Sequence, residues 1–198
     1  MKKSLFAAAM VAVALAGSAA SADIVTYTDT QTGSIVDNAT LSIDHLVAPG
    51  DGAILSLDEI RVNIFHTFVG DLLVTLTHTD SGTSVVLFDR PGVPPIFGNG
   101  DDLGGTYTFV ANAQNMFPEA GGQGTVPPGV YTIAGDLSVF ANVDTAGTWR
   151  LSVTDGASGD VGRVDGFSWT VTTVPTPGAV ALAGLGSIAL FRRRRSSN

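Results

Sequence analysis

The residues with the clearest chemical potential are four aspartates that lie in two glycine-rich stretches. Asp101 and Asp102 lie in the stretch 91–105, and Asp155 and Asp160 lie in the stretch 155–166. Carboxylate oxygens on flexible loops are the ligands that Ca²⁺ prefers in proteins. Aspartates are equally common where a side chain caps its own turn by accepting hydrogen bonds from backbone amides. We therefore expect either calcium ligands or turn caps at these four positions.

The histidines and serines raise the question of hydrolytic chemistry. The three histidines are His45, His66 and His78, and Ser81 and Ser84 lie beside a turn, where serine is common for conformational reasons. A Ser-His-Asp triad can be written on paper, but no G-x-S-x-G nucleophile elbow occurs. No histidine has a second ligand at the close spacing of a zinc site. We expect no catalytic residues, and we expect His66 to make a structural hydrogen bond that fixes a connection between strands.

Alternating hydrophobicity around these residues predicts that β-strands position them. Trp149, Leu151 and Val153 alternate with polar residues, and the same period of two continues from Phe167 through Trp169. The stretch 147–172 is therefore expected to form a hairpin. Because each of its strands carries one of the two tryptophans of the chain, we expect this hairpin to anchor the core.

The rest of the chain has the composition of an all-β protein. It has 24 glycines, no cysteine and no long helical pattern. We expect two short strands in 23–57, a three-stranded meander in 59–90, and long irregular loops at 91–105 and 111–129. Roughly eight strands in one domain, residues 23–173, predict a β-sandwich or jelly roll.

The distribution of charge excludes one class of partner. The formal net charge is −8, but six of the ten basic residues lie at the two ends, so the middle carries 4 − 18 = −14. Such a surface repels phosphate backbones, and we expect no nucleic acid partner. Divalent cations or a saline exterior suit it better, as does a simple contribution to solubility.

The first 22 residues have the three parts of a secretory signal peptide. Lys2 and Lys3 form the positive region, Leu5 to Gly17 is apolar, and Ala20-Ser21-Ala22 is a small-residue cleavage site. The apolar part is short for a membrane span. We expect export, with signal peptidase cutting after Ala22 to leave Asp23 at the new N-terminus.

The last 25 residues form a second targeting signal. Val174-Pro175-Thr176-Pro177 precedes an apolar run, 179–191, and the cluster Arg192, Arg193, Arg194 and Arg195. The run predicts a short transmembrane helix whose arginines stay on the cytoplasmic side. The order of the three parts resembles the PEP-CTERM sorting signal of exported bacterial proteins, with Thr176 where that family usually has glutamate. The resemblance implies processing by an exosortase-like enzyme; a plain membrane anchor is the alternative.

Two motifs in the middle of the chain resemble the P domain (P/Homo B domain) of proprotein convertases. They are HTFVGDLLVTLTHTDSGTSVVLFDR at 66–90 and GTWRLSVTDGASGDVGRVDGFSWTV at 147–171. The resemblance implies a β-sandwich of jelly-roll type and a module that accompanies a subtilisin-like catalytic domain, for which this chain has no room. Some P domains bind calcium, so the resemblance also implies calcium as the cofactor to test.

These features together predict a non-catalytic exported module of the cell envelope or extracellular matrix, with a structural, adhesive or binding role. Its partner would be an envelope protein or an exopolysaccharide. One alternative is an accessory to a separately encoded subtilisin-like serine protease. A second is a glycan-binding module, which needs an exposed aromatic platform. Phe117, Tyr107 and Tyr131 are the candidates, although alternation favours core positions for both tyrosines.

Overall fold

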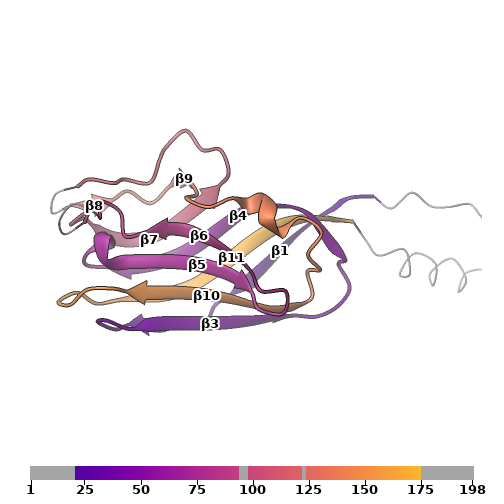
Figure 1. Ribbon diagram of the computed structural model, residues 1–198, viewed down its shortest axis with the longest axis horizontal. Helices are drawn as coiled ribbons and strands as arrows, with labels where there is room; N and C mark the ends of the chain where they lie inside the picture. The colour runs from indigo at the N-terminus through magenta and orange to yellow at the C-terminus, as the bar shows by residue number, and fades with distance from the viewer. Residues whose placement is uncertain (1–20, 94–97, 122–123, 175–198) are drawn as a thin grey trace, which may run out of the picture.

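The computed structural model describes residues 21–93, 98–121 and 124–174, which contain eleven strands and two 3₁₀ segments (Figure 1). In chain order they are β1 (Asp23–Asp29), β2 (Gly33–Ile35), β3 (Thr40–Val47), β4 (Ala53–His66), η1 (Val69–Asp71), β5 (Leu72–His78), β6 (Thr83–Asp89), β7 (Asp102–Val110), β8 (Thr125–Val126), β9 (Val130–Thr132), η2 (Leu137–Phe140), β10 (Gly147–Asp155) and β11 (Gly162–Val174).

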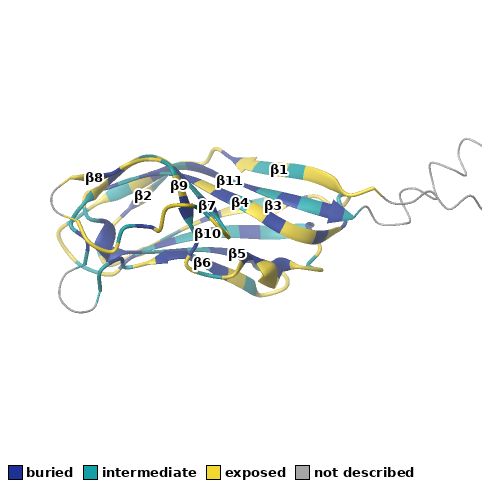
Figure 2. Cartoon of the chain, turned by 90° about the horizontal axis from the view of Figure 1, so that it is seen from above, coloured by how far each residue is buried: buried dark blue, intermediate teal, exposed yellow. Residues whose placement is uncertain are grey.

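The strands form two sheets that face each other, so the prediction of an all-β sandwich is confirmed. One sheet has seven strands in the order β1-β11-β4-β7-β8, with β2 also on β11 and β9 on β7. The other has four strands in the order β3-β10-β5-β6. Figure 2 shows the buried residues lying along the strands between the two layers.

The predicted three-stranded meander in 59–90 is wrong, because β5 pairs with β6 while β4 belongs to the other sheet. The strand boundaries in the first third of the chain also differ from the prediction. The sequence predicts a break before residue 59, whereas β4 runs without interruption from Ala53 to His66. Its pairing with β11 shifts register at three places, between Val164 and Phe167, between Thr170 and Val171, and between Thr172 and Thr173. Such bulges change which face a side chain takes. They allow Val164 and Phe167, three residues apart, both to face the core, a change of phase that strict alternation excludes.

The expected hairpin in 147–172 is wrong, because β10 and β11 lie in different sheets and do not pair with each other. The two tryptophans nevertheless lie at the centre of the core, as predicted. Trp149 on β10 and Trp169 on β11 are both fully buried, and their ring centroids are 5.0 Å apart. Phe140 stacks on Trp149 and Phe167 stacks on Trp169. Since the two rings come from opposite sheets, this contact joins the two layers directly.

The three aromatic residues considered for glycan binding are all in the core, as alternation favours for the two tyrosines, so they do not form an exposed platform. Phe117 is 5% exposed, Tyr107 1% and Tyr131 7%. Phe117 stacks on Phe88 at 4.5 Å and meets Tyr131 edge-on. The loop 111–129 therefore folds its aromatic residue inward under β7 rather than presenting it to a sugar.

The predicted signal peptide and the predicted C-terminal sorting signal lie almost entirely outside the described residues. This holds for Ala20 of the cleavage site and for the sorting motif from Pro175 to the arginine cluster. Ala22 directly precedes β1, and Val174 is the last residue of β11. Asp23 pairs with Thr173, so the two ends of the described chain lie side by side. No helix among the described residues is long and apolar enough to cross a membrane.

The two tryptophans offer a matched test of the core. Trp149 Nε1 donates a 2.9 Å hydrogen bond to the buried carbonyl of Thr145, whereas Trp169 Nε1 has no hydrogen-bond partner among the described residues. Both changes to phenylalanine remove the same ring volume, but W149F also leaves a buried carbonyl unsatisfied. We expect W149F to lower the free energy of unfolding by about 1 to 3 kcal/mol more than W169F, measured by urea denaturation. Equal losses would contradict this account.

Candidate functional site

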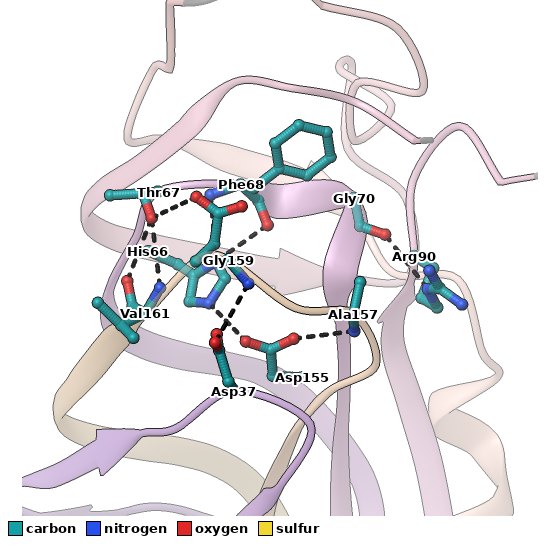
Figure 3. A network of polar contacts seen from close by, with 11 residues as sticks. Asp37, His66, Thr67, Phe68, Gly70, Arg90, Asp155, Ala157, Gly159 and Val161 are labelled. Atoms are coloured by element: carbon teal, nitrogen blue, oxygen red, sulfur yellow. Dashed lines mark hydrogen bonds and ion pairs between the residues drawn. The ribbon is translucent and has the colours of Figure 1, made fainter. Parts of the chain in front are cut away.

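Residues from the two sequence motifs meet at one end of the sandwich (Figure 3). The end of β4, the segment η1 and the loop between β10 and β11 are held together there by backbone contacts. Gly162 pairs with His66, and Gly156 N donates to Asp71 O at 2.9 Å. Motifs about 80 residues apart in sequence thus form one polar cluster.

The centre of this cluster is a buried pair formed by His66 and Asp155. His66 Nε2 lies 3.3 Å from Asp155 Oδ2, and neither side chain has any exposed surface. His66 Nδ1 lies 2.9 Å from Phe68 O, and Asp155 Oδ1 accepts a 3.1 Å hydrogen bond from Ala157 N. The structural hydrogen bond predicted for His66 is confirmed. A buried polar pair of this kind is stable only when its atoms keep their partners, so it fixes both loops.

Thr67 and Asp160 form a second, more exposed layer over this pair. Thr67 Oγ1 donates to Asp160 Oδ1 at 2.8 Å and accepts from Val161 N at 3.3 Å. Gly159 N donates to Asp37 Oδ2 at 3.1 Å, which ties the same loop to the turn before β3. Asp160 therefore acts here as a loop clamp.

Gly162 is required by the close approach of the two strands. A Cβ atom at this position would collide with the carbonyl oxygen of Phe65 and with the His66 ring. Only glycine lets β11 pass so near to the end of β4. The presence of glycine at position 162 of the second motif is thus explained by backbone packing rather than by ligand binding.

Asp71 is the carboxylate in this cluster that the fold stabilises least. It is 4% exposed, and its side chain accepts no hydrogen bond from the described residues. Burial raises the pKa of Asp71, and the neighbouring charges of Asp155 and Asp160 raise it further, while His66 and Arg90 oppose the shift. Arg90 itself donates to Gly70 O at 3.4 Å.

Asp101 and Asp102 lie near this cluster but serve a different connection. Asp101 Oδ1 accepts a 2.9 Å hydrogen bond from Gly124 N, and Asp102 N donates to Gly124 O at 2.8 Å. Val69 N donates to Asp101 O at 2.9 Å, which links this stretch to η1. The two glycine-rich stretches do approach each other, as the sequence suggests, since Asp102 and Gly162 line one hollow.

The hollow is an open cavity of about 440 Å³ at the same end of the sandwich. Its lining includes Phe65, His66, Thr67, Asp102 and Arg163. The Arg163 guanidinium lies 3.9 Å from the centroid of the Phe65 ring and 3.0 Å from Asp165 Oδ2. The single cation of the lining is therefore already held by an aromatic face and a carboxylate.

Three of the four predicted aspartates, Asp101, Asp155 and Asp160, have carboxylates that accept hydrogen bonds within the protein, and the four do not form a metal cage. Across residues 21–93, 98–121 and 124–174, no three His, Cys, Asp or Glu side chains gather closely enough to hold a metal ion. Asp155 accepts a hydrogen bond from Ala157 N, two residues further on, which is the local turn cap expected from the sequence. Asp101 and Asp160 instead accept from distant segments, from Gly124 N and Thr67 Oγ1 respectively. This arrangement of the described residues does not fit the several oxygen ligands that calcium needs.

The serines lie in turns rather than in a catalytic arrangement. Ser81 Oγ lies 2.9 Å from His78 Nδ1, but His78 Nε2 contacts the carbonyl of Ala146, not a carboxylate. Ser81 Oγ also accepts from Thr83 N at 3.2 Å, a bond that closes the β5–β6 turn. Ser84 bonds to Thr77 across the same hairpin. Among the described residues, this pair lacks the acidic residue that orients a catalytic histidine.

Asp71 generates a prediction about pH. A carboxyl group whose folded-state pKa is raised favours folding while it is protonated. Its contribution is therefore present below the ordinary aspartate value of 3.8 and is lost as the pH rises through the raised pKa. We expect D71N to remove this loss, so that the variant is more stable than the wild type at pH 7 and the difference disappears toward pH 3.

The measurement is the urea midpoint of the full chain across that pH range, with D136N as the control. Asp136 is exposed, and hydrogen bonds from Ser138 lower its pKa, so D136N should act in the opposite direction at neutral pH. A D71N protein less stable than the wild type at pH 7 would show that the carboxylate makes a stabilising contact.

Comparison with known proteins agrees with the motifs and the sandwich. Residues 58–171 match the family described as proprotein convertase P-domain. A calcium-dependent protease of Trichormus variabilis (strain ATCC 29413 / PCC 7937) is 31% identical over 108 residues, which cover 54% of this chain but only 12% of that protein.

Two solved structures of an Aeromonas sobria serine protease are also similar. One, in complex with the chaperone ORF2, has 16% identity and a TM-score of 0.47, and the match covers 78% of this chain and 27% of that one. The other has 17% identity and a TM-score of 0.45, with coverage of 77% and 27%. The family match spans more than half of the sequence, and the chain belongs to the proprotein convertase P-domain family.

Proposed function

We propose that this chain is a non-catalytic exported module that works by binding another macromolecule outside the cytoplasm. The observation that carries the proposal is the use of the motif side chains. His66 and Asp155 are fully enclosed and bond to each other and to the backbone. Side chains with no exposed surface cannot touch a substrate, so the motif contributes a rigid scaffold, and binding falls to the surfaces around it.

A second candidate role is that of an accessory to a separately encoded subtilisin-like protease. It is favoured by the similarity to a protein named a calcium-dependent protease, in which the aligned region is a small part of the whole. In this role the module would act in trans, on a protease encoded by another gene. This role and the envelope role predict different captured partners.

Calcium binding stays a prediction of the sequence for Asp101, Asp102, Asp155 and Asp160. The name of the similar protease supports testing it. The carboxylates of Asp101, Asp155 and Asp160 already accept hydrogen bonds from protein groups. Binding experiments therefore need a calcium arm and a chelator arm.

The cellular address is also a proposal. We infer from the order of the terminal motifs that the chain is exported by its first 22 residues and held in the membrane by residues 179–191, with Arg192 to Arg195 inside. Processing by an exosortase-like enzyme at the motif beginning with Val174 would release the module outward.

The binding role predicts capture without hydrolysis. We expect the immobilised full chain to retain a defined protein or polysaccharide from the envelope and culture fractions of its own organism. We also expect unfolded casein to stay intact when mixed with the chain, with S81A as the matched variant. Retention is measured by mass spectrometry and sugar analysis, in calcium and in chelator. A retained subtilisin-like protease would select the accessory role, and Ser81-dependent cleavage of casein would overturn the non-catalytic assignment.

The address predicts a location. We expect the full chain to sediment with the envelope, and a variant lacking residues 175–198 to appear in the medium with an unchanged melting temperature. β11 ends at Val174, so the deletion removes no described strand. Immunoblots of the fractions give the readout, and envelope retention of the truncated chain would contradict the proposed anchor.

A further inference from the structure

The open edge of β1 is the surface feature that the motif does not explain. A two-sheet sandwich has four edges, and two of them carry additional backbone. Ala134 N and Gly135 N donate to Leu87 O and Val86 O along β6, at 3.0 and 2.9 Å. The outer side of β7 carries β8 and β9.

The third edge, β3, is contacted by a side chain at one carbonyl. Gln31 Nε2 donates to Asp44 O at 3.0 Å, while the same amide group reaches Asp29 Oδ2. By contrast, β1 pairs with β11 along its whole length, and no other described backbone pairs with its second side. Figure 2 shows β1 at the margin of its sheet.

Two contacts identify which groups of β1 point outward. Ile24 N donates to the side chain of Asp23 at 2.9 Å rather than to a strand. The hydroxyl groups of Thr26 and Thr170 meet at 2.9 Å, as expected of a non-hydrogen-bonded antiparallel pair, in which side chains are closest. By alternation, the backbone groups of Ile24, Thr26 and Thr28 face away from β11.

The sequence of this edge lacks the usual protection against pairing. Natural proteins place lysine, proline or bulges on exposed edges to prevent association. The segment 24–28, Ile-Val-Thr-Tyr-Thr, has no charge, no proline and four β-branched residues. Ile24 is 71% exposed. The edge is therefore flat, uncharged and suited to accept a strand.

The surrounding charge selects among strands that could add there. All 18 acidic residues lie in the described part of the chain, with only four of the basic residues, and Arg61, Arg150 and Arg163 are each paired with a carboxylate. A second copy of the chain would bring the same excess of negative charge to the edge. A cationic segment would be attracted to it.

We propose that β1 is a docking edge for an extended, lysine- or arginine-bearing segment of a partner protein, which adds to the seven-stranded sheet by β-augmentation. The occupant pairs with the outward backbone groups of Ile24, Thr26 and Thr28, and the acidic surface supplies the preference for positive charge. The inference rests on the proposed binding role and names its surface. Partner capture through another face would leave that role intact and refute this one.

The test uses a fluorescent peptide of alternating lysine and valine, as long as the seven residues of β1, and the same peptide with glutamate for lysine. Binding to the full chain is followed by anisotropy at low salt. We expect saturable binding of the lysine peptide and none of the glutamate peptide. T26P removes an outward N–H without touching the ladder to β11, and we expect it to weaken binding about tenfold or more. T26V keeps the N–H and should bind as the wild type does.

Since proline could also disturb the strand, T26K provides a second variant. It keeps the backbone intact and repels the cationic peptide, so it should lose binding with an unchanged melting temperature. Equal binding by wild type, T26P and T26K would show adsorption to the acidic surface and overturn the proposal. No binding of the lysine peptide up to about 1 mM, or a β1-dependent dimer in sedimentation, would overturn it as well.

Discussion

The long pairing of β4 with β11 is the constraint on which the rest of the structure depends. The middle of this ladder places Trp169 against Trp149 of the opposite sheet, and one end places Gly162 against His66. The hydrophobic core and the polar cluster are therefore two consequences of one register. A slip of one residue would turn Trp169 outward. It would also move Gly162 away from its position beside Phe65 and His66, where the strands are too close for a Cβ atom.

The polar end of this ladder gives specificity at an energetic cost. The His66–Asp155 pair has no exposed surface, and burial of Asp71 beside it raises the pKa of that carboxyl group. Such groups add little net stability compared with apolar residues of similar volume, yet they are strict about geometry. Their value lies in fixing where the loop after β10 sits relative to η1. The family motif is in this sense a specification of loop position.

The sequence allowed prediction of which side chains face the core wherever hydrophobic residues alternate regularly. It did not allow prediction of how the strands pair or where their register shifts. Alternation identified Trp149 and Trp169 as core residues, but it starts the second strand only at Phe167, whereas β11 begins at Gly162 and the bulge between Val164 and Phe167 hides the continuation. Phe117 was undecided from sequence because it lies in an irregular loop, where no period exists. The contribution of Asp37 had no signal at all, since its bond to Gly159 joins segments 122 residues apart.

The motif residues His66 and Asp155 are fully enclosed and bond within the fold. Functional differences between members of the family are therefore expected at positions outside this pair. In this chain such positions have a distinct chemistry. The outer faces of both sheets are rich in threonine and serine, whose hydroxyl groups pair across strands, as Thr40 does with Thr154. Three of the four described arginines are bound to carboxylates, so the free charge of the surface is almost wholly negative. The proposed binding role therefore draws on exposed backbone and on long-range attraction, because the four described arginines are already engaged within the fold.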